Sequence, residues 1–160
     1  MGIRLIKIVL SLSLALWGLI AGAMNLVDYE NGVSYVFGVI SIGGADSLRA
    51  INSPALAHLG YAFIYLGKFA TGILCGMGTI NLWTARHSEA NDFNRAKSNT
   101  YLGCGIALFM LFFGFIVVAG SLFTPIEFDA GRTLFHQYAL FYAGFIGLIA
   151  LYIGMPDQEL

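Results

Sequence analysis

Residues 53–85 read SPALAHLGYAFIYLGKFATGILCGMGTINLWTA and contain a single charged side chain, Lys68. An α-helix rises about 1.5 Å per residue, so about 20 apolar residues cross a hydrocarbon core roughly 30 Å thick. Ser53 followed by Pro54 is typical of a helix N-terminus, because the serine caps the helix and the proline fits its first position. The stretch therefore predicts a membrane-spanning helix over 53–85.

Three further apolar stretches, over 3–27, 100–123 and 133–155, are long enough to span a bilayer. Pro125 and Pro156 follow the last two stretches, where prolines commonly end helices. We therefore predict a single all-α domain over 1–160, a four-helix transmembrane bundle with up-down-up-down connectivity.

The first stretch has an alternative interpretation. Arg4 and Lys7 precede its apolar run, and small residues at 21–23 follow, a pattern that a cleavable signal peptide shares. We expect the stretch to be retained as a span.

The overall composition excludes an ordinary soluble domain. Hydrophobic residues make up 58% of the chain and charged residues 11%, and the mean hydropathy is +0.78. Soluble domains carry about 25% charged residues, and a small one cannot bury this much apolar surface. The net charge of −1 offers no basic field for nucleic acid. The two cysteines make neither a disulfide framework nor a zinc site.

The basic residues near the span ends predict the orientation, since cytoplasmic loops are enriched in Lys and Arg. One end of the bundle would carry Arg4, Lys7, Arg86, Arg95 and Lys97, and the other Arg49 and Arg132. We therefore expect a bacterial inner-membrane protein with both termini in the cytoplasm. We also expect 85–99 to be a solvated inner connection.

Residues 28–52 lie between the first two spans, and their apolar part is too short to span a bilayer. The middle of this segment is apolar and aromatic, and Gly43-Gly44 interrupts it. Such a segment favours an interfacial helix that forms an outer cap on the bundle, with a short strand as the alternative.

A polar stripe runs along the second predicted span. Its members recur at helical steps of three, four or seven residues and are His58, Tyr61, Tyr65, Lys68, Cys75 and Thr79. Unpaired polar groups are costly in lipid, so the stripe should face the bundle interior. A lysine at mid-membrane costs about 2.5–3.5 kcal/mol, which marks Lys68 as a candidate site. Acidic residues that could pair with Lys68 are Asp28, Glu30, Glu127 and Asp129.

The role of Lys68 has three interpretations at this stage. A structural ion pair is one, a transport or proton-relay role is another, and binding of an anionic ligand is the third.

His58 and His136, near the outer ends of the second and fourth spans, could together ligate haem b or copper. Hydrogen bonding at the headgroup level is the simpler alternative for both histidines.

Two glycine pairs have the spacing that lets transmembrane helices approach closely. Gly18 and Gly22 form one pair in the first span, and Gly72 and Gly76 form the other in the second. These pairs predict helix packing, either within the bundle or with another membrane protein.

Several short motifs give the chain a wider resemblance. They are Asp28-Tyr29, Arg49-Ala50-Ile51 before Ser53-Pro54, His58 with Tyr61, Phe93-Asn94, Ala96-Lys97, and Phe112 with Gly114-Phe115. In this order and spacing the chain resembles a bacterial family of predicted small integral membrane proteins, a domain of unknown function. The resemblance implies a four-span membrane fold and no particular activity.

No catalytic constellation is visible in the sequence, so we do not expect an enzyme. The sequence favours a non-catalytic membrane subunit that packs against other subunits or copies of itself, most simply without a cofactor. One alternative is a protein that binds a small ligand, ion or quinone in a polar pocket under the outer cap. That pocket would be built from Lys68, Asp28, Tyr61, Tyr65 and His58. Haem b or copper binding is the second alternative.

Overall fold

A computed structural model describes residues 2–41, 50–123 and 130–158, with the side chains of the last range described from Gln137 onward. The elements are α1 (Gly2–Val27), α2 (Tyr29–Ile40), α3 (Pro54–Thr84), the short η1 (Ala85–His87), α4 (Ala90–Ala96), α5 (Ser98–Phe109), the π-helix η2 (Met110–Leu122) and α6 (Ala130–Gly154). No strand occurs in these ranges, and the predicted all-α class is confirmed.

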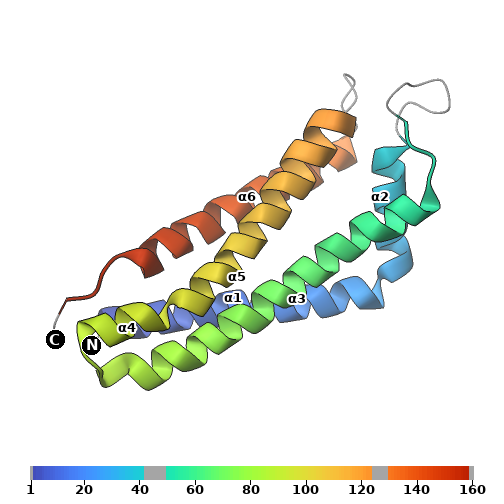
Figure 1. Ribbon diagram of the computed structural model, residues 1–160. Helices are drawn as coiled ribbons and strands as arrows, with labels where there is room; N and C mark the ends of the chain where they lie inside the picture. Colours follow the sequence, from blue (N-terminus) through green and yellow to red (C-terminus); the bar gives the residue numbers. More distant parts are fainter. Residues whose placement is uncertain (1, 42–49, 124–129, 159–160) are drawn as a thin grey trace.

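Within the described residues, four helical segments are long and apolar enough to cross a membrane: Gly2–Val27, Pro54–His87, Ala90–Leu122 and Gln137–Gly154. Figure 1 shows both termini and α4 at one end of the bundle, and α2 at the opposite end. The chain therefore runs up, down, up and down, as predicted. The orientation of the bundle relative to the cytoplasm stays a prediction from the charge distribution.

Helices α1 and α3 cross in close backbone contact. A Cβ atom on Gly18 would lie 2.5 Å from the backbone nitrogen of Gly72, so the two backbones touch where the helices cross. Gly22 packs against the ring of Phe69, with its hypothetical Cβ 3.2 Å away. Gly76 lies outside the crossing, because a Cβ there would meet only the Cβ of Ala15, at 3.9 Å.

The third apolar helical segment begins earlier in the chain than predicted, at Ala90. We expected a solvated connection over 85–99, but helix α4 occupies much of it, and Phe93 and Lys97 are at most 2% exposed. Phe93 packs with Ile8 and Leu82, the three forming a small core at this end of the bundle. The prediction failed because apolar residues spaced three apart, Ala90 and Phe93, give the segment a buried helical face.

The outer cap is helical over residues 29–40. Helix α2 packs on α3, and Val39 and Ile40 form a small core with Ala57 and Phe123. The strand alternative is therefore wrong for this part of the cap, while residues 42–49 lie outside the described residues. Helix α2 thus closes one side of the bundle at the end opposite the termini (Figure 1).

Candidate functional site

The polar stripe of α3 faces mainly inward. Tyr61 and Cys75 are buried, Tyr65 and Lys68 are half-buried, and His58 is exposed at the outer end of the helix. The stripe therefore turns away from lipid once α3 has passed the level of His58.

Lys68 has a neutral partner. Its ammonium Nζ donates a hydrogen bond to Oδ1 of Asn25, at 3.1 Å. The backbone carbonyl of Asn25 accepts a second hydrogen bond from the Tyr61 hydroxyl, at 2.8 Å. Among the side chains that the structure describes, no carboxylate lies within ion-pair distance of Lys68. Its hydrogen-bond partner is thus a neutral group, while Glu127 and Asp129, two of the predicted acidic partners, lie outside the described residues.

The structure does not bring Asp28 to Lys68. The chain turns after α1, and Asp28 occupies the N-cap position of α2. There its carboxylate accepts a hydrogen bond from the side chain of Asn31, at 2.5 Å. Asn25, one turn earlier on α1, is the residue that reaches Lys68 instead.

Lys68 lines a cavity of about 290 Å³ where four elements meet. The walls come from α1, α3, η2 and α6, and the lining residues are Trp17, Ala21, Lys68, Leu111, Phe115, Tyr138, Ala139 and Tyr142. The rings of Trp17 and Tyr142 are 5.7 Å apart and tilted. An apolar cavity of about 150 Å³ suffices for benzene, so this one can accommodate a substituted aromatic ring.

The other residues of the stripe form a separate cluster around Tyr29. The Tyr29 hydroxyl is 2.9 Å from Nδ1 of His58, and its ring contacts those of Tyr61 and Tyr65. The residues predicted to form one pocket therefore divide between two places. Lys68 faces the aromatic side chains of α6, and Asn25 links it to the Tyr29 cluster through Tyr61.

Comparison with known proteins identifies the family. The family described as predicted small integral membrane protein matches residues 3–151. The chain belongs to this family. No curated protein and no solved structure matches the chain. The family's description names no activity, so the function of this small integral membrane protein has to be argued from its site.

The predicted haem or copper site of this small integral membrane protein includes His136, whose side chain lies outside the described residues. Its predicted partner, His58, is engaged by Tyr29. Among the described residues, no group of three or more His, Cys, Asp or Glu side chains comes together. Haem or copper binding through two histidines stays a prediction.

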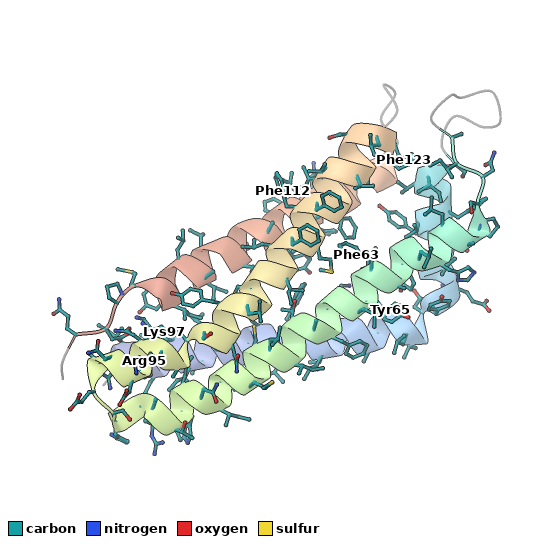
Figure 2. All side chains as sticks on the ribbon, in the orientation of Figure 1. Phe63, Tyr65, Arg95, Lys97, Phe112 and Phe123 are labelled. Atoms are coloured by element: carbon teal, nitrogen blue, oxygen red, sulfur yellow. The ribbon has the colours of Figure 1, made fainter. Side chains whose placement is uncertain are left out.

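Sequence reasoning missed a charged cluster at the end that carries the termini. Lys7 of α1 and Lys97, between α4 and α5, each place Nζ 2.6 Å from Oδ2 of Asp157. Both lysines also donate to the backbone carbonyl of Met155, and Lys97 donates to Asn94. The three charged side chains are 2–6% exposed. Figure 2 labels Lys97 at this end, close to both termini.

The environment of Asp157 affects its ionisation. Burial alone would raise the pKa of the carboxyl, but hydrogen bonds and charge from Lys7 and Lys97 outweigh it and hold the pKa below its ordinary value. The carboxylate therefore stays ionised and ties α1, the α4–α5 junction and the end of α6 together. A signal existed in the sequence: the predicted topology brings both lysines and Asp157 to the same end of the bundle.

Proposed function

We propose that this membrane protein binds a small lipophilic organic anion in the cavity lined by Lys68, and that it does so without catalysing a reaction. The observation that carries the proposal is the ammonium group of Lys68. It is half-buried on the wall of an aromatic cavity, and its hydrogen-bond partner, Asn25, is neutral.

The energetics favour an anion at this position. A lysine charge within the membrane costs about 2.5–3.5 kcal/mol when no group compensates it. A carboxylate ligand would neutralise the charge and form a charge-assisted hydrogen bond. The remaining walls include the rings of Trp17, Phe115 and Tyr142, which suit an organic body better than an inorganic ion.

A pair of isosteric probes tests the proposal. Benzoate carries a carboxylate on an aromatic ring, and benzamide has nearly the same shape without the charge. The fluorescence of Trp17 on the cavity wall can report binding in a Trp83→Phe background, since the chain has two tryptophans. We expect benzoate to bind at least about tenfold more tightly than benzamide, because hydrogen bonds to charged groups contribute about 1.5–3 kcal/mol.

Variants of α3 give the matched controls. Lys68→Met should weaken benzoate binding to the level of benzamide, and Lys68→Arg should retain most of it because the charge remains. Tyr65→Phe should leave binding unchanged, since Tyr65 lies on the same helix but does not line the cavity. Equal binding of both probes, or tight benzoate binding by Lys68→Met, would show that the ammonium is not the recognition group.

Association with another membrane protein is a second candidate function, and α6 supports it. The described part of α6, Gln137–Gly154, is the least covered of the four apolar helices in the described residues. Gly144 and Gly147 lie on it with open space where a Cβ would be, which leaves room for a close helix contact. We expect mild detergent extraction to yield a particle well above 17.3 kDa plus the micelle. Gly144→Leu should reduce its size, and a monomeric wild-type particle would refute the association.

A further inference from the structure

A second cavity lies beside the Lys68 cavity, toward the end of the bundle that carries α2. It measures about 260 Å³ and is bounded by α2, α3 and η2. Its walls are almost entirely apolar and include Val36, Ile40, Leu56, Phe63, Val118 and Phe123. Figure 2 shows Phe63 in the space between α3 and η2, and Phe123 at the end of η2 nearest α2.

The two cavities are neighbours. Phe115 of η2 lines both of them. Ile64 lines the apolar cavity and lies one helical turn before Lys68, so the two residues share a face of α3. An apolar chain attached to a group at Lys68 would therefore meet the apolar cavity on the other side of Phe115.

The length of the apolar cavity fits the chain of a membrane lipid. Leu56 precedes Lys68 by twelve residues of α3, which corresponds to about 18 Å along the helix. One leaflet of a bilayer contributes about half of a hydrocarbon core roughly 30 Å thick. An acyl chain that fills one leaflet thus has about the length from Lys68 to the outer end of the cavity.

We infer that the ligand is a long-chain fatty acid, with its carboxylate on Lys68 and its chain in the apolar cavity between α2, α3 and η2. The inference rests on the proposed function, because it takes the anion at Lys68 as given. One ammonium matches one carboxylate. A volume of about 260 Å³ is less than twice that of a cavity that holds benzene, so it takes part of one long chain and excludes the two chains of a phospholipid.

The wall shared by both cavities is unusual. Residues Met110–Leu122 form a π-helix, a conformation that is rare in proteins. In this chain the π-helix supplies Leu111 and Phe115 to the Lys68 cavity, and Phe115 and Val118 to the apolar one. The irregular segment of the third span thus coincides with the place where both parts of the ligand would lie.

Photolabelling of the full chain in lipid nanodiscs tests the inference. The probe is hexadecanoic acid with a diazirine at its terminal carbon, and the control probe is the corresponding alcohol. Peptide mapping should find the acid's label on the α2 and η2 residues of the apolar cavity. We expect the alcohol to label these residues about tenfold less, because it lacks the charge that pairs with Lys68.

Two valine variants separate binding of the acyl chain in the apolar cavity from background contact with lipid. Val36→Phe should fill the apolar cavity and lower the labelling there by about tenfold, while benzoate binding stays unchanged. Val27→Phe, at a position 79% exposed, is the matched control and should label as the wild type does.

The outcomes distinguish this inference from the proposed function. If benzoate binds through Lys68 but the acid and the alcohol label the apolar cavity alike, the acyl-chain site is refuted and the anion site at Lys68 stands. The same holds if the acid labels mainly the exposed outer surface of α6. If benzoate binding does not depend on Lys68, the proposed function fails, and the fatty-acid inference fails with it.

Discussion

Replacing Asp157 with alanine is expected to lower the free energy of unfolding by about 3–5 kcal/mol, the usual cost of removing one partner of a buried ion pair. Lys7 and Lys97 both hold their ammonium groups 2.6 Å from the Asp157 carboxylate and are almost fully buried. Without the carboxylate, two like charges would face each other in a poorly solvated place. Denaturation of the purified protein in mixed micelles measures the change.

Asp92 provides the matched control for this prediction. It lies in α4 at the same end of the bundle, but it is exposed. Asp92→Ala should change the free energy of unfolding by no more than about 0.5 kcal/mol. Similar losses in both variants would mean that the charged cluster contributes nothing specific.

The acid response of the wild type should depend on the same carboxylate. Its pKa is held low in the folded state, so its contribution is fully present above the unfolded pKa of about 3.9. The contribution is lost as the pH falls through the lower folded value. Asp157→Asn should therefore lose less stability than the wild type when the pH is lowered through about 4 and below.

Gly72→Ala is the second substitution with a large expected effect. A Cβ at this position would lie 2.7 Å from the backbone nitrogen of Leu19 and 3.0 Å from the carbonyl carbon of Gly18. Backbone atoms cannot move aside as a side chain can, so α1 and α3 would have to separate. Overpacking of this kind costs about 1–3 kcal/mol or more, and unfolding in mixed micelles measures it.

Gly76→Ala is the control for the helix crossing. Its new Cβ would meet only the Cβ of Ala15, at 3.9 Å, which is ordinary contact. Alanine has the higher helix propensity by about 1 kcal/mol, so this variant should be neutral or slightly more stable. If the two alanine variants behaved alike, the close backbone contact between α1 and α3 would be contradicted.

Periodicity in the sequence was enough to predict the spans and the inward face of α3. The polar residues of that helix recur at helical steps, and lipid excludes unpaired polar groups, so only one orientation is stable. The partner of Lys68 could not be predicted in the same way. It depends on where α1 ends, and the turn at Asp28 carries the expected carboxylate into the cap of α2 and leaves Asn25 in reach.

The charged cluster and the cavities needed three-dimensional information for different reasons. Lys7, Lys97 and Asp157 are far apart in the chain and resemble ordinary residues at span ends until the helices are packed. Residues of the π-helix 110–122 line both cavities, and hydrophobicity alone does not distinguish a π-helix from an α-helix. The position of Phe115 on both cavity walls becomes visible only once α1, α2, α3 and α6 are packed around this segment.

The most direct test of anion binding at Lys68 is to measure the mass of the protein with any ligand that stays bound after gentle extraction from the membrane. Native mass spectrometry of gently extracted wild-type protein should show one bound organic acid per chain, and the Lys68→Met variant should lack it. Equal amounts of bound acid in both proteins, or none in the wild type, would contradict the proposal that the Lys68 ammonium holds an anionic ligand.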